Sequence, residues 1–213
     1  MIWEEKAEED QQAVGVGFFV ADNVAFTAAH NLKALRRGSK VVGRYGKPFE
    51  NVRLQFKLLA YDKEADYAQL VLESVSPSDF RHTYLPLRSE LPRITTRCHL
   101  LTYSLGIRAD MLPLDQSYSM GIFPAAITRE HPRHFLFNST AWCGDSGAAL
   151  ILADGMVVGM HLESVNHYRE FHRQQEADIA ARLNDVEESI LALTAGSANG
   201  FIGLKASVLS ALL

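Results

Sequence analysis

Short apolar runs with frequent breaks occupy most of the chain. Between Gln12 and Ala29, two runs rich in Val and Phe flank the turn-type cluster Ala21-Asp22-Asn23, and this arrangement predicts a β-hairpin. Further strand-like runs follow at 40–45, 52–61, 67–72, 95–103, 117–126, 134–138, 148–152 and 156–161. Strands at this spacing, without helical periods between them, predict an all-β barrel or sandwich.

Residues 74–92 differ from the runs on either side, because they contain Pro77, Pro86 and Pro92 and little periodic pattern. Such a stretch is typical of a connector. We therefore place the midline of the chain here, with one half at 1–85 and the other at 86–213.

The pattern changes again near the C-terminal end. From Arg169 to Leu193 the apolar residues recur at helical spacing, with acids and Arg between them, and the small residues and glycines of 194–200 follow. This predicts an amphipathic helix within an insertion at about 167–195. Its apolar stripe has three possible roles: it covers the body of the protein, covers a cleft, or packs against a second copy of the chain. A homo-oligomer formed through this insertion is therefore one of the alternatives.

Composition and charge narrow the function classes. Of 213 residues, 47% are hydrophobic and 22% charged, as in an ordinary folded protein. The 21 Lys and Arg against 25 Asp and Glu give a net charge of −4, which provides no general attraction for nucleic acid or anionic lipid. We expect neither nucleic acid nor a membrane as partner, since no apolar run reaches the ~20 residues that span a bilayer.

The N-terminus and the cysteines point to a cellular location. The first ten residues carry five acids and one Lys, unlike a secretory signal. Only Cys98 and Cys143 are present, too few for the disulfide framework of a small secreted protein. An intracellular, cytoplasmic protein is expected.

Three short segments carry the residues of acyl-transfer chemistry. They are Thr27-Ala-Ala-His30, Asp66-Tyr-Ala-Gln-Leu70 and Gly144-Asp-Ser-Gly147, and they supply a His, an Asp and a Ser in that order. A serine hydroxyl needs a base within hydrogen-bond reach, and an imidazole base needs a carboxylate to fix its tautomer. Small residues beside Ser146 also allow the amides of Gly144 and Ser146 to point at a developing oxyanion.

These segments resemble the marks of the trypsin-like (chymotrypsin-fold, PA-clan) serine peptidases, which are T-A-A-H, D-x-A-x-L and G-D-S-G in the same order. The sequences around Gly15–Val20 and Gly200–Lys205 also look like the strand before the histidine and the last strand of that family. The resemblance implies two six-stranded antiparallel β-barrels, the first carrying His30 and Asp66 and the second Ser146. It implies a serine endopeptidase acting on proteins or peptides, with no cofactor and no metal.

The same resemblance assigns roles and a specificity pocket. Ser146 is the expected nucleophile, His30 the general base and Asp66 the residue that orients His30. The expected substrate-binding residues are Thr140, Ala141, Cys143, His161, Leu162 and Glu163. The triplet ending in His161 is similar to one that recognises Gln or Glu in viral 3C-like and glutamate-specific peptidases. The residue before the cleaved bond (P1) is therefore expected to be Gln or Glu. A small or apolar P1 residue is the alternative. His161 as a buried, backbone-bonded residue is the competing interpretation.

Some positions depart from the family pattern. Asn31 and Trp142 stand where secreted relatives usually have bridged cysteines, which indicates a member without disulfides. Only 29 residues precede His30, fewer than relatives activated by N-terminal cleavage use. We therefore expect no such activation, and a partner for Asp145 other than a new N-terminus.

Other interpretations remain beside the peptidase. A catalytically inactive scaffold of the same fold would bind peptides or partner proteins in its cleft. An α/β-hydrolase is disfavoured because Ala148 breaks its G-x-S-x-G motif. A zinc site is disfavoured as well, because the histidines at 131, 134, 161, 167 and 172 lack a pattern such as HExxH.

Overall fold

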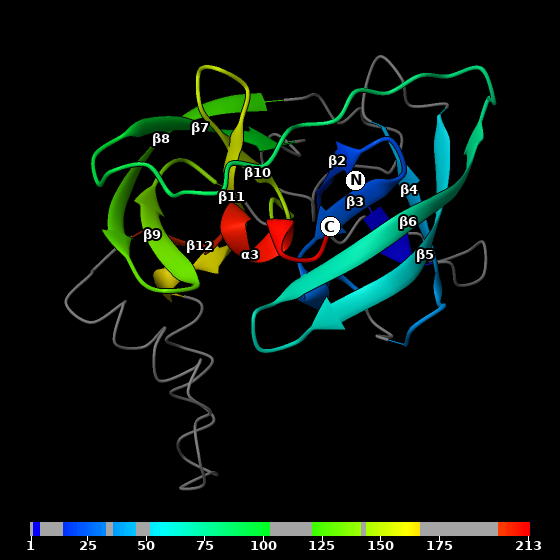
Figure 1. Cartoon of the computed structure of the whole chain (residues 1–213), viewed down its shortest axis with the longest axis horizontal. Coiled ribbons are helices and arrows are strands. Elements are labelled where there is room, and N and C mark those ends of the chain that lie inside the picture. Colours follow the sequence, from blue (N-terminus) through cyan, green and yellow to red (C-terminus); the bar gives the residue numbers. More distant parts are fainter. Residues whose placement is uncertain are drawn as a thin grey trace, which may run out of the picture.

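The computed structural model describes residues 2–4, 15–32, 36–45, 52–102, 121–141, 144–166 and 200–213. The strands of its first half are β1 (Ile2–Glu4), β2 (Gly17–Ala21), β3 (Val24–Thr27), β4 (Lys40–Arg44), β5 (Arg53–Asp62) and β6 (Tyr67–Ser76), with a 3₁₀ turn η1 (Ala29–Asn31) after β3. The second half contains β7 (Arg97–Thr102), β8 (Gly121–Glu130), β9 (His134–Asn138), β10 (Ala149–Ile151), β11 (Val157–Ser164), β12 (Phe201–Lys205) and the helix α3 (Ala206–Ser210). The two groups of strands lie beside each other, with α3 between them (Figure 1).

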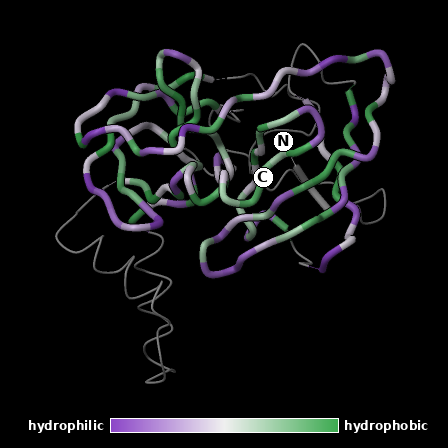
Figure 2. The backbone as a smooth tube through the Cα atoms, viewed as in Figure 1, coloured by the Kyte–Doolittle hydropathy of each residue, from purple (hydrophilic) through white to green (hydrophobic). Residues whose placement is uncertain are grey.

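The first half forms a six-stranded antiparallel sheet in the order β1-β4-β5-β6-β3-β2. Alternation explains its longest strand, because Leu54, Phe56 and Leu58 of β5 are buried while the residues between them are exposed. The buried face packs with Phe19, Val41 and other apolar residues into one core. The polar positions therefore lie outside, as the hydropathy colours show along the outer turns (Figure 2).

The second half is a closed antiparallel barrel in the order β10-β11-β12-β9-β8-β7. Phe135 and Phe137, both fully buried, fill its interior together with Leu100, Ile127 and Leu150. Closure leaves no free sheet edge along most of the strands. The all-β, chymotrypsin-like fold predicted from the sequence is confirmed, with one closed barrel and a second sheet.

Some elements differ from the sequence prediction. The strand expected at 67–72 continues to Ser76, and the strand expected at 117–126 is seen from Gly121 to Glu130. The short helix α3 was not predicted. The amphipathic helix expected at about 167–195 lies outside the described residues, so the oligomer contact that it suggested stays a prediction.

The connector passes from one half to the other near residue 85. The Leu85 amide donates to the carbonyl of Phe19 in the first sheet, at 2.8 Å. Immediately afterwards, Pro86 and Arg88 form backbone hydrogen bonds with Val157 of the barrel, both 2.8 Å. The backbone partners of the connector thus change from the first sheet to the barrel between residues 85 and 86, and the boundary placed there stays a prediction.

An apolar cluster joins the halves. It contains Phe18, Phe26 and Tyr67 of the first half and Met160 and Leu209 of the second, among other buried residues. The amide of Gln69 adds a polar contact, donating to the carbonyl of Leu212 after α3 at 3.2 Å. The two halves therefore share a packed core, which holds them in a fixed position relative to each other.

No helix within the described ranges is both long and apolar enough to cross a membrane.

Candidate active site

His30 and Asp66 are joined directly, although 36 positions separate them in the chain. His30 lies in η1, just after β3, and Asp66 lies in the turn that leads into β6. The Asp66 carboxylate contacts His30 twice: Oδ2 is 2.6 Å from Nδ1, and Oδ1 accepts the His30 backbone N–H at 2.9 Å. The Asp66 carbonyl also accepts the amide of Ala29 at 3.3 Å. The acid therefore holds both the ring and the backbone of the histidine turn.

The conformation of Asp66 depends on its own turn. Its φ is 59°, a left-handed value that Asp adopts more readily than most residues. Asp62 stabilises this turn, because its Oδ1 accepts the amides of Glu64 and Ala65, both at 2.9 Å. Its Oδ2 pairs with Arg133 of the barrel at 2.9 Å. Asp62, another acid close to Asp66 in the chain, therefore has partners of its own.

Ser146 belongs to the second half, in the loop that leads into β10. The Gly147 amide donates to the carbonyl of His161 and the His161 amide to that of Ala148, both at 2.8 Å, which fastens the loop to β11. The Ser146 carbonyl accepts two hydrogen bonds from the first half, from the amide of Val16 and from Nδ2 of Asn31, both 2.8 Å. The backbone of the serine is thus fixed to both halves.

Gly147 allows this close approach. Its φ is +89°, and a Cβ at this position would lie 2.0 Å from the carbonyl oxygen of Val16 and 2.7 Å from Oγ1 of Thr27. Any side chain would push the serine loop away from the first half. The second glycine of the G-D-S-G segment is therefore required by contact between the halves.

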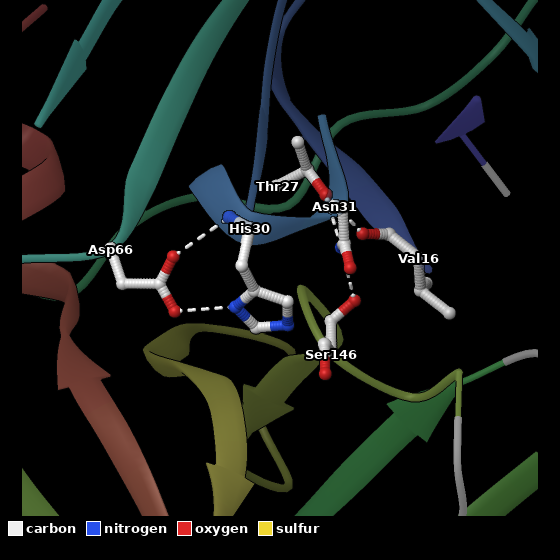
Figure 3. A network of polar contacts seen from close by, with 6 residues as sticks. All are labelled: Val16, Thr27, His30, Asn31, Asp66 and Ser146. Carbon is white, nitrogen blue, oxygen red and sulfur yellow. Dashed lines mark hydrogen bonds and ion pairs between the residues drawn. The ribbon is translucent and has the colours of Figure 1, made fainter. Parts of the chain in front are cut away.

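The three chemical side chains converge. The His30 ring lies between Asp66 and Ser146, and its second ring nitrogen is on the edge that faces the serine (Figure 3). In the described part of the chain, no hydrogen bond joins that nitrogen to the Ser146 hydroxyl; such contacts often shorten only when substrate binds. The His30 side chain is 46% exposed and that of Asp66 20%, so the pair is open to a ligand on the histidine side.

The charges around His30 favour its protonated form. Burial lowers the pKa of His30, but the hydrogen bond and charge of Asp66, together with the charge of Glu163, raise it by more. The pKa of His30 therefore lies above its ordinary value of 6.5. An imidazole with this environment takes up a proton readily near neutral pH.

The segment before the serine contains two unused backbone donors. Gly144 has a φ of 94°, and Ser146 follows two residues later. Neither amide donates to an acceptor anywhere in the described ranges. Asp145, between them, is 1% exposed, and its Oδ1 accepts the hydroxyl of Thr102 at 2.5 Å. Thr102 is therefore one partner of the buried acid.

The predicted pocket residues lie in different environments. Thr140 is exposed, Ala141 and Glu163 are half-buried, and Leu162 is buried, while Cys143 lies outside the described residues. His161 is 3% exposed and packs edge-on against the rings of Phe137 and Phe201, at centroid distances of 5.7 and 5.4 Å. Burial, reinforced by the charge of His30, lowers the pKa of His161 to about 3, so its imidazole is neutral.

Metal-binding residues do not gather in the described structure. Within its ranges, no three side chains of His, Cys, Asp or Glu come together in a way that holds a metal ion. His167 and His172 lie outside those ranges. Burial raises the pKa of the Cys98 thiol to about 11, so this free thiol is protonated at neutral pH.

Sequence reasoning missed the residues that join the halves at the serine. Asn31 stood out only because it replaces a cysteine of relatives, Thr27 only as the first residue of the T-A-A-H segment, and Val16 only as a strand residue. The hydroxyl of Thr27 donates to the Val16 carbonyl at 2.6 Å and accepts from Nδ2 of Asn31 at 3.0 Å. A polar residue directly after the histidine was the one available signal.

Comparison with protein families identifies one match. The profile of the trypsin-like peptidase domain matches residues 15–160, which contain His30, Asp66 and Ser146. No curated protein sequence matches the chain.

Solved structures of low sequence identity share the fold. The MamO protease domain from Magnetospirillum magneticum is 8% identical, with a TM-score of 0.63 over 100% of this chain and 94% of that one. The active form of the Rv3671c protease from M. tuberculosis is 18% identical, with a TM-score of 0.55 over 93% of this chain and 71% of that one. Neuropsin, a serine protease of mouse brain, is 12% identical, with a TM-score of 0.57 over 93% of this chain and 86% of that one.

Proposed function

We propose that this chain, which belongs to the trypsin-like peptidases, is a serine endopeptidase that works through an acyl-enzyme on Ser146. One observation carries the proposal: His30 Nδ1 lies 2.6 Å from Asp66 Oδ2, and the opposite edge of the ring faces Ser146 (Figure 3). Proteins or peptides are the substrates that the family implies.

The first step uses the tautomer that Asp66 selects. The Asp66 carboxylate accepts a hydrogen bond from Nδ1–H, which leaves the lone pair of Nε2 directed at Ser146. Ser146 Oγ then attacks the peptide carbonyl carbon as its proton passes to His30 Nε2. The imidazolium gives that proton to the leaving amine when the C–N bond breaks, and water hydrolyses the resulting ester by the same route.

The developing oxyanion needs donors that are already in place. The amides of Gly144 and Ser146 have no acceptor in the described part of the protein and lie on either side of the buried Asp145. Asp145 holds this segment through Thr102 at 2.5 Å. We assign these two amides to the oxyanion, where removing one such donor typically lowers turnover by about 10²–10³.

The preference for the P1 residue is expected to depend on the pocket that contains His161. His161 presents a neutral imidazole, which can donate to the side-chain oxygen of a Gln or Glu at P1. A small or apolar P1 residue is the competing proposal, because His161 is almost completely buried between two aromatic rings. A peptide-library cleavage profile distinguishes them: His161→Phe removes a Gln or Glu preference but leaves a small or apolar one.

The serine mechanism is tested with a fluorophosphonate probe and intact-mass analysis. Wild type is expected to form a single adduct at Ser146 that Ser146→Ala lacks, and His30→Ala is expected to react at least about 10³-fold more slowly. Hydrolysis of a small ester is measured in parallel. A folded wild type that forms no adduct contradicts the proposal.

That outcome favours a second candidate, an inactive peptide-binding scaffold. The observation in its favour is that no hydrogen bond joins His30 to the Ser146 hydroxyl in the described structure. A scaffold would bind peptides equally well with and without Ser146→Ala.

A further inference from the structure

A closed set of hydrogen bonds links the histidine turn to the serine loop. Asn31, the last residue of η1, donates through Nδ2 to the carbonyl of Ser146 at 2.8 Å and to Oγ1 of Thr27 at 3.0 Å. Thr27 donates to the Val16 carbonyl at 2.6 Å, and the Val16 amide donates to the same Ser146 carbonyl at 2.8 Å (Figure 3). These contacts connect three segments of the chain around the backbone of the serine.

The chemistry of these partners fixes the orientation of the Asn31 amide. The Ser146 carbonyl can only accept, and the Thr27 hydroxyl hydrogen is already used on Val16, so both must face the NH₂ group. The other end of the amide, Oδ1, is left buried without a donor in the described structure. An unpaired buried acceptor is costly, and a residue that merely filled this space would avoid that cost. This favours a role for the NH₂ group.

The backbone around Asn31 prevents the amide from moving. Asn31 is 2% exposed. A Cβ at Gly15 would lie 2.1–2.4 Å from the amide atoms of Asn31, so the chain at Gly15 lies flat against the amide. The two donors of Asn31 are therefore held in one direction, toward Ser146 and Thr27.

We propose that Asn31 is a positioning residue that sets the placement of Ser146 relative to His30. This inference rests on the proposed serine peptidase function. Asn31 follows His30 in the same 3₁₀ turn, so a single hydrogen bond separates the turn that holds the base from the backbone of the nucleophile. A non-covalent link thus stands at a position where secreted relatives have a bridged cysteine, and a misplacement of about 1 Å in such a site can reduce the rate about 10²-fold.

The test compares Asn31 with Gln69, a second buried amide that donates across the halves. Asn31→Leu and Asn31→Asp are matched with Gln69→Leu and Gln69→Glu, and kcat, KM and the phosphonylation rate of Ser146 are measured. We expect Asn31→Leu to lower kcat and phosphonylation about 10²-fold with KM within about threefold of wild type. Both Gln69 variants should stay within about threefold in kcat. Equal losses in the two pairs overturn the proposal.

A pH series separates positioning from loosened packing. The carboxylate in Asn31→Asp cannot donate to the Ser146 carbonyl, but its protonated form can. The activity of Asn31→Asp relative to wild type should therefore recover as the pH falls from about 8.5 to about 5.5, roughly the range in which a buried carboxyl titrates. That of Asn31→Leu should not recover. A ratio that does not change with pH overturns the proposal, and this comparison decides the matter if Asn31→Leu fails to fold.

A readout without catalysis separates this inference from the proposed function. If wild type forms no adduct at Ser146, the peptidase proposal fails, and amide hydrogen exchange then decides the role of Asn31. Exchange of the Val16 and Gly147 amides should accelerate about tenfold in Asn31→Asp but not in Gln69→Glu. Unchanged exchange in Asn31→Asp overturns the positioning role.

Discussion

Asp66 and His30 contact each other through two hydrogen bonds of 2.6 and 2.9 Å, and both belong to the first half of the chain. Ser146, by contrast, lies in the second half and meets the first through its backbone carbonyl, which accepts from Val16 and Asn31. The acid and the base are therefore assembled within the first half. The nucleophile is placed by contacts between the two halves.

The two parts of the site are therefore sensitive to different changes. The His30–Asp66 pair depends on two neighbouring turns and should survive small shifts between the halves. The position of Ser146 depends on close packing of backbone against backbone, where no side chain fits at Gly147. Changes in the first region should alter proton transfer, and changes in the second should alter the stability and geometry of the serine loop.

We expect the greatest loss of activity when the Asp66 carboxylate is removed. Asp66→Asn should keep the fold but lower kcat about 10⁴-fold, because an amide no longer selects the Nδ1–H tautomer of His30. The kcat for a small ester, with circular dichroism to verify folding, measures the effect. Asp62→Asn is the matched control: its carboxylate bonds to Arg133 and to the turn amides, so kcat should fall by less than about tenfold. If the two losses were interchanged, Asp62 would be the orienting acid.

An intermediate effect is expected from breaking the packing between the halves. Gly147→Ala should lower the free energy of unfolding by roughly 2–5 kcal/mol, since overpacking adds to left-handed backbone strain. Gly155→Ala is the control, because Gly155 has a similar φ of +83° but a Cβ there would meet no atom within 4 Å. It should lose only about 1–2 kcal/mol. Urea unfolding measures both, and equal losses would show that the approach to Val16 carries no strain.

The strands could be predicted from the sequence because they are encoded locally. Alternating burial along β5 follows the period of a strand, and the hairpin of β2 and β3 follows its turn residues. The segments around His30, Asp66 and Ser146 are likewise short, so each can be identified as a motif without knowing the fold around it.

The contacts between the halves could not be predicted, for a physical reason. Asn31 and Ser146 are 115 positions apart, and an asparagine after the histidine does not show which carbonyl its amide will reach. Thr102 similarly reaches Asp145 only once the barrel is closed. Such partners are set by tertiary packing, which has no signal in local spacing.

A weaker effect is expected on the base itself, because a charge in the second half also acts on His30. Glu163 of β11 raises the pKa of His30 by its charge. Glu163→Gln removes that charge, so the pKa of His30 should fall and the neutral, base-competent form should persist to lower pH. The acid limb of kcat/KM should therefore move to lower pH, while the plateau at high pH stays unchanged. A kcat/KM profile with a small ester measures the shift.

Glu130→Gln is the matched control, because Glu130 also lies in the barrel but pairs with Lys205 at 2.6 Å, and its charge is not among those that raise the pKa of His30. Its acid limb should coincide with that of wild type. An acid limb that does not move in Glu163→Gln would mean that the charges acting on His30 come from the first half alone, and an upward shift would contradict the direction in which Glu163 acts. A downward shift would show that the barrel, which holds the nucleophile by packing, also tunes the base by charge.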